Sequence, residues 1–133
     1  MLFKKTKEIK SKSGVLHFRR WQLFKTPWFV VNIHGIYHKD DDLHLHSHPW
    51  NFLSIVLWGS YVEELQGGKM NLRTFLNTAY RKAEAFHKIR LLCTKSVYTL
   101  NFMSTKTREW GYDVDGKFVG HQEYRQLKRQ KKS

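Results

Sequence analysis

The sequence predicts an all-β fold. Three observations indicate it: short segments rich in β-branched and aromatic residues recur along the chain, turn residues separate them about every eight to twelve residues, and helical character is scarce. A double-sheet jelly roll suits this number of short strands. With 133 residues the chain fits one domain and is long enough to bury a core.

The strands are expected from the alternation and composition of each segment. Segment 51–58 is apolar at nearly every position, which is typical of a strand covered on both faces. Gln66-Gly67-Gly68-Lys69 gives the clearest hairpin turn. In chain order the expected strands are 15–24, 28–37, 43–50, 51–58, 61–65, 71–76, 86–92, 96–103, 109–114 and 117–124.

Two segments have helical character, and one loop is acidic. Segment 77–84 is moderately helical and short, and 123–132 is expected to form a terminal helix. Asp40-Asp41-Asp42 could bind a hard cation, but three consecutive aspartates lack the spacing of a calcium loop. A solvated loop is the preferred interpretation.

Positive charge is concentrated at the two ends of the chain. Residues 1–13 and 121–133 each carry five lysines or arginines and one glutamate, so together they supply +8 of the net charge of +13. We therefore divide the chain into a basic leader (1–14), a barrel (15–124) and a basic tail (125–133). The ends could bind nucleic-acid phosphates by counterion release, or could simply increase solubility.

Cysteine usage and hydropathy indicate the compartment. The single cysteine, Cys93, excludes an internal disulfide and fits a reducing cytosol. No apolar run approaches the length of a membrane span, and no apolar signal segment follows the basic start. The expectation is a cytoplasmic protein without a membrane partner.

Three histidines at alternate positions, His44, His46 and His48, carry the clearest chemical signal. In an extended strand they project from one face, and neutral imidazole is the commonest protein ligand for several transition metals. The pattern predicts half of a metal site. The alternative is that these histidines are hydrogen-bonded structural residues.

A third ligand has to arrive from a distant strand. His87, at the start of an expected strand, is the natural candidate, and His44 is either a fourth ligand or, preferably, a rim residue. If Glu63 faces inward it could be a ligand, an outer-shell partner or a general base; the alternative is a solvated Glu63–Glu64 pair. Arg90 could bind an anionic substrate, or could lie on the surface.

These residues resemble a known family. His46-Ser47-His48 followed by Gly59 resembles the first cupin motif, and His87 matches the histidine of the second. The chain departs from the motifs at Phe52, where the family has an acidic ligand, and in the residues before His87, where proline and glycine are absent. The match covers roughly 42–103.

The resemblance narrows further to one group of cupins. HSHPWNF with GSYVEE, then FHKI and REWGY, is similar to small, mostly uncharacterised cupin-like proteins of phage and bacterial genomes. It implies a single-domain cupin-type jelly-roll barrel with a site in its mouth, located in the host cytoplasm if the chain is phage-encoded. Cupins often pair edge strands into dimers, so unpaired edges here would allow a homodimer, although the sequence does not specify the oligomeric state.

The missing acidic ligand implies a neutral site. His46, His48 and His87 would hold a divalent ion (iron, zinc or nickel) as in the cupin thiol dioxygenases, and Tyr98 is the one candidate for the tyrosine that supports their chemistry. The implied function is a metal-dependent oxygenase or isomerase acting on a small molecule. Two alternatives stay open: a non-enzymatic phage-type module whose basic tails bind nucleic acid or a virion partner, and a metal-free epimerase-like cupin that binds sugar nucleotides.

Overall fold

A computed structural model describes residues 4–39, 44–105 and 109–132. Asp40–Asp42, the acidic loop of the sequence analysis, lies outside these residues. The described elements are β1 (Lys4–Lys10), β2 (Leu16–Lys25), β3 (Phe29–Ile36), β4 (Phe52–Trp58), β5 (Tyr61–Leu65), β6 (Met70–Arg73), β7 (Thr78–Arg81), β8 (His87–Leu92), β9 (Val97–Ser104), β10 (Gly111–Val114), β11 (Lys117–Gly120) and α1 (His121–Lys132).

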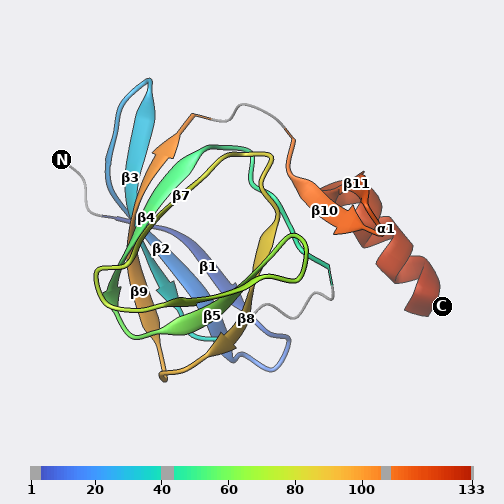
Figure 1. Ribbon diagram of the computed structural model, residues 1–133, viewed down its shortest axis with the longest axis horizontal. Coiled ribbons are helices and arrows are strands. Elements are labelled where there is room, and N and C mark those ends of the chain that lie inside the picture. The colour runs from blue at the N-terminus through green and yellow to red at the C-terminus, as the bar shows by residue number, and fades with distance from the viewer. Residues whose placement is uncertain (1–3, 40–43, 106–108, 133) are drawn as a thin grey trace.

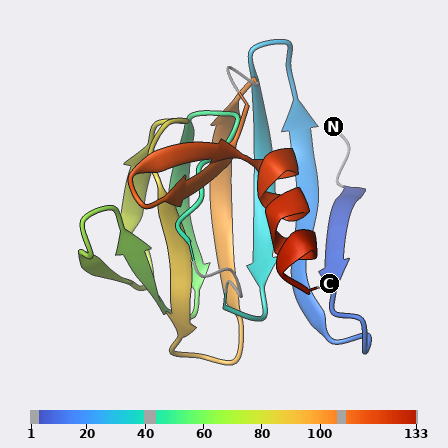
Figure 2. The ribbon, with the colours of Figure 1, turned by 90° about the vertical axis from the view of Figure 1, so that its right-hand side faces the viewer.

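The strands form two main antiparallel sheets, which confirms the all-β jelly-roll prediction (Figure 1). The larger sheet has the order β1-β2-β3-β9-β4-β7, and the smaller has the order β6-β5-β8. The β10–β11 hairpin and α1 lie together against one side of this barrel, where Figure 2 shows them in front of the sheets. Within the described residues, no helix has the length and apolar character needed to cross a membrane.

The apolar core joins the two sheets. Ile36, Val56 and Val97 from the large sheet cluster with Tyr61 from the small one, and all four side chains are buried. Phe18, Ile89 and Leu92 pack against this cluster. The core therefore lies between the two sheets.

The helical prediction for segment 77–84 is wrong. Thr78–Arg81 forms β7, which pairs with β4 in the register Phe52↔Arg81 to Ile55↔Thr78. The reason is tertiary context: a segment this short has weak helix propensity, and pairing with β4 supplies backbone hydrogen bonds and buries Ala79.

The basic leader contributes a strand that the sequence analysis did not assign. Lys4–Lys10 pairs with β2 across the register Lys4↔Gln22 to Lys10↔Leu16. Glu8 strengthens this pairing, since the Arg19 Nε donates to its Oε2 at 2.7 Å and the Lys5 Nζ does so at 3.0 Å. The terminal helix is confirmed as α1, and the expected strand 117–124 ends at Gly120, where α1 begins.

Gly59, the glycine of the first cupin-like motif, lets the chain turn tightly from β4 to β5. Its φ is +82°, and a Cβ there would overlap the Ser96 carbonyl oxygen. Gly67, in the hairpin between β5 and β6, has a similar φ of +86° but nothing within 4 Å of an added Cβ. The two glycines therefore share a backbone conformation and differ in crowding.

We predict that Gly59→Ala destabilises the fold far more than Gly67→Ala. Left-handed backbone strain alone should cost Gly67→Ala about 1–2 kcal/mol. Gly59→Ala adds the steric overlap, so its free energy of unfolding should fall by at least about 2 kcal/mol more. Urea unfolding of both variants measures this. Equal losses would show that the contact between the β4–β5 turn and Ser96 is not tight.

Candidate metal centre

The candidate site is built on a backbone pairing between two distant histidines. The His46 N–H donates to the His87 carbonyl at 2.9 Å, and the His87 N–H donates to the His46 carbonyl at 2.8 Å. The two residues therefore form an antiparallel bridge. Of the expected strand 43–50 the structure describes 44–50, and within this part only His46 adopts bridge geometry and no residue belongs to a strand. Directly opposed residues project their side chains from the same face, so the two rings meet.

His48 completes a triangle of imidazoles. It lies two residues after His46 in a locally extended segment, and its ring falls on the same side. The ring centroids are separated by 5.1 Å (His46–His48), 4.9 Å (His46–His87) and 5.0 Å (His48–His87). The Nε2 atoms of His48 and His87 are 2.8 Å apart, and one nitrogen from each ring lies within 4.8 Å of the others.

Glu63 fixes the orientation of the His87 ring. The His87 Nδ1 donates to the Glu63 Oε2 at 2.7 Å, which leaves the Nε2 lone pair directed at the other histidines. The Arg81 Nη2 donates to the second carboxylate oxygen, also at 2.7 Å. Burial by itself raises the pKa of Glu63, but the hydrogen bonds and charges of His87 and Arg81 outweigh burial and lower the pKa to about 2. Glu63 is therefore a buried carboxylate that bridges His87 and Arg81.

The surroundings keep His48 neutral. Burial lowers the pKa of His48 well below its usual range, and the charges of His87 and His46 lower it further. Phe52 contacts the His48 ring edge to face at 5.1 Å, so an apolar ring stands where the cupin motif has a carboxylate. A neutral imidazole offers its lone pair to a metal without first losing a proton.

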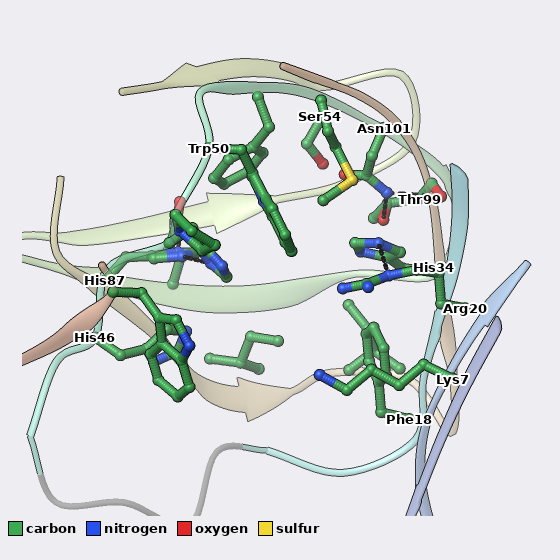
Figure 3. Close-up of a pocket in the computed structure, with 18 of the residues that line it drawn as sticks. Lys7, Phe18, Arg20, His34, His46, Trp50, Ser54, His87, Thr99 and Asn101 are labelled. Carbon is green, nitrogen blue, oxygen red and sulfur yellow. Dashed lines mark hydrogen bonds and ion pairs between the residues drawn. The ribbon is translucent and has the colours of Figure 1, made fainter. Parts of the chain in front are cut away.

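A cavity of about 680 Å³ extends from the three histidines into the barrel. Figure 3 shows His46 and His87 at one end and Lys7, Arg20 and His34 at the other. Side chains from both sheets line it, and Trp110, Tyr112 and His121 close it from the β10 side. The cavity is large enough for a small molecule.

Solved structures similar to this chain share its barrel. It resembles a cupin-2 domain protein from Rhodospirillum rubrum with a TM-score of 0.62 and 11% identity, over 92% of this chain and 79% of that one. The chain has the cupin fold. No protein-family model and no curated protein sequence matches it.

Two enzyme structures are similar as well. One is HppE with Fe(II), at 15% identity and a TM-score of 0.61 over 77% of this chain. The other is a structure of DMSP lyases, at 20% identity and a TM-score of 0.55 over 65% of this chain. The chain spans 60% of the HppE chain and 47% of the lyase chain, so the likeness concerns the barrel alone.

Two of the predicted catalytic residues do not reach the cavity of the barrel. Tyr98 lies on the outer face of β9, where its hydroxyl hydrogen-bonds the Tyr37 hydroxyl at 3.1 Å. Arg90 is exposed, and its Nη1 donates to Glu64 at 2.9 Å. The reason is strand alternation: Thr99 on β9 and Ile89 on β8 face inward, so their neighbours face outward.

His44 is held away from the triangle. Its Nδ1 hydrogen-bonds the hydroxyl of Tyr124 in α1 at 3.0 Å, and the two rings meet edge to face. The structure therefore places His44 beside the helix that flanks the barrel. It brings together His46, His48, His87 and Glu63, and it adds residues that the sequence analysis did not single out: Lys7, Arg20, His34, Arg81, Thr99 and Asn101.

We predict that Glu63→Gln weakens metal binding about 10–100-fold, because the amide no longer provides a carboxylate to orient and polarise His87. Competition with a chromophoric chelator on folded protein measures the affinity. Glu64→Gln is the matched control, since Glu64 is the next residue of β5 and pairs on the outside with Arg90. Equal affinities for the two variants would contradict an outer-shell role of Glu63.

Proposed function

We propose that this cupin is a metal-dependent enzyme that acts on a small molecule, with one divalent ion held by His46, His48 and His87. The observation that carries the proposal is the convergence of three imidazole nitrogens within 4.8 Å at the end of a cavity of about 680 Å³. A structural ion needs no such cavity beside it. A catalytic ion needs both open coordination positions and space for a substrate.

The donor set fits a catalytic transition metal. Three neutral imidazoles suit iron, zinc or nickel, and three protein ligands leave coordination positions open. Because Phe52 replaces the carboxylate of the motif, the ligands cancel none of the ion's charge. When bound, such an ion would act as a Lewis acid on a substrate oxygen, or would bring a small co-reactant beside the substrate.

The chain's own residues would hold and orient the substrate. Glu63 keeps His87 in one tautomer, and Trp50 and Phe52 form apolar walls next to the histidines. Thr99 and Asn101 present polar groups deeper in the cavity.

The similar enzymes support metal chemistry on this barrel without choosing the reaction. HppE is described with Fe(II), and the other structures are of lyases. One fold hosts many reactions, so the residues that line the cavity decide which reaction takes place there. We therefore propose an oxygenase or an isomerase reaction for this chain. The identity of the metal is the first measurement that would distinguish the two.

We predict near-stoichiometric metal in the purified protein, lost in the His46→Ala/His48→Ala double variant. Elemental analysis of untagged protein measures the content. His17→Ala/His38→Ala is the matched control: these two histidines stack outside the cavity with ring centroids 4.0 Å apart, and removing them should leave the metal in place. Iron would direct assays toward oxygen-dependent turnover, and zinc or nickel toward isomerisation. Equal metal content in both variants would refute the site.

We also propose that helix α1 binds an anionic polymer such as nucleic acid. Tyr124 anchors the helix: it is buried and stacks on Tyr112 at 3.7 Å. Arg125 and Arg129 are exposed on the same helix. The helix is therefore held beside β10 by the contacts of Tyr124 with Tyr112 and His44 and by the stacking of His121 on Trp110. It presents cations to solvent, which is an arrangement suited to phosphate backbones.

For this second proposal we predict nucleic-acid binding that weakens steeply with salt. Arg125→Gln/Arg129→Gln should reduce the slope of log K against log salt concentration by about 2. Fluorescence anisotropy with a labelled single strand measures it. The His46→Ala/His48→Ala variant is the control and should bind as the parent does. Binding that is absent at low salt, or insensitive to salt, would refute the role of α1.

A further inference from the structure

A row of polar side chains crosses four adjacent strands at the end of the cavity opposite the metal centre. Lys7 on β1 stands opposite Arg20 on β2, Arg20 opposite His34 on β3, and His34 opposite Thr99 on β9. All four line the cavity. Directly opposed residues of an antiparallel pair have Cβ atoms about 5 Å apart, so the register alone gathers these groups on one wall.

This wall concentrates positive charge. Lys7 and Arg20 are like charges in directly opposed positions, an arrangement that weakens a sheet. The nearest acidic residue on β1, Glu8, faces the other side and pairs with Arg19 and Lys5. Among the described residues, no carboxylate forms an ion pair with Arg20, and its contacts are with His34 and with the rings of Phe18 and Trp50.

The guanidinium of Arg20 is held in place, but not all of its hydrogen-bond donors are used. Its Nε donates to the His34 Nε2 at 3.2 Å, and its Cζ lies 5.3 Å from the Trp50 ring centroid. Burial and the charges of Arg20 and Lys7 lower the pKa of His34 well below its usual range, so His34 remains a neutral acceptor. Within the described part of the chain, neither terminal nitrogen of Arg20 donates a hydrogen bond to the protein.

The adjoining wall continues the polar character. Thr99, Asn101 and Ser54 are 2%, 2% and 3% exposed, yet they line the cavity in place of apolar core residues. The Asn101 Nδ2 donates to the Thr99 Oγ1 at 2.8 Å and thereby orients that hydroxyl. Figure 3 shows Thr99 and Asn101 beside His34, with Lys7 and Arg20 extending into the same space.

We propose that the cavity binds a small organic oxyanion, with its carboxylate or phosphoryl group on Arg20 and Lys7 and the remainder of the molecule reaching toward His46, His48 and His87. A guanidinium with two free terminal nitrogens matches two oxygens of one such group. What we infer for the end of the ligand near the histidines rests on the proposed metal-dependent function. What we infer for the oxyanion rests only on the wall that carries Arg20 and Lys7, so it can be tested without metal.

The test titrates inorganic phosphate, acetate and neutral acetamide into chelator-treated protein and follows backbone NMR shifts. Phosphate and acetate should bind and acetamide should not. Arg20→Gln/Lys7→Gln should weaken oxyanion binding at least about tenfold. Arg19→Gln/Lys5→Gln is the matched control, because these cations sit on the same two strands and contact Glu8 outside the cavity. Lys7→Gln alone, at an exposed position, serves if the double variant does not fold.

The outcomes separate this inference from the proposed metal site. Oxyanion binding that is lost with Arg20 and Lys7 but retained in His46→Ala/His48→Ala supports it, whether or not the protein binds metal. Binding that requires added metal and ignores Arg20 and Lys7 would place the anion on the ion, overturning the inference while leaving the metal site. Absence of binding, or equal weakening by the outer-face control, would also overturn it.

Discussion

The backbone bridge between His46 and His87 is the constraint on which the site depends. It joins the segment after β3 to the start of β8, and the same segment pairs with β10, because the Ser47 N–H donates to the Gly111 carbonyl at 2.8 Å. One extended stretch therefore ties the small sheet to the hairpin that carries α1. The rings of His46 and His87 meet because their backbones are paired, so the same hydrogen bonds that close this side of the barrel also bring two of the candidate ligands together.

The predictable part of the site is the part that depends on local alternation. His46 and His48 share a face because any extended segment of three residues alternates its side chains, and a full strand is not required. The position of Glu63 follows the same rule on β5. His87 was a candidate because it stands at the start of an expected strand, and it also matched the histidine of the second cupin motif. Its pairing with His46 is a long-range contact that composition and periodicity do not specify.

The unsuccessful predictions share one physical cause. Alternation shows which side chains of a strand share a face. Pairing with other strands decides which of the two faces points into the barrel. Tyr98 and Arg90, which were offered as catalytic candidates, lie on outward faces, and the sequence analysis gave no role to Arg20. Its inward direction follows from its register with His34. Likewise, β1 and β7 exist because β2 and β4 provide edges for them, which a reading of each segment alone does not reveal.

A second arginine in the same cavity, Arg73, has a structural role and can be compared with Arg20. Arg73 is 2% exposed, and its guanidinium donates to the Asn77 Oδ1 at 2.7 Å, the Ser54 carbonyl at 2.8 Å and the Tyr61 hydroxyl at 2.9 Å. The fold provides acceptors for the guanidinium of Arg73 because burying an unpaired charge costs free energy. Arg20 receives no comparable set of acceptors, although it faces the same space. The difference between the two arginines is the structural reason to regard one wall of this cavity as built for a ligand.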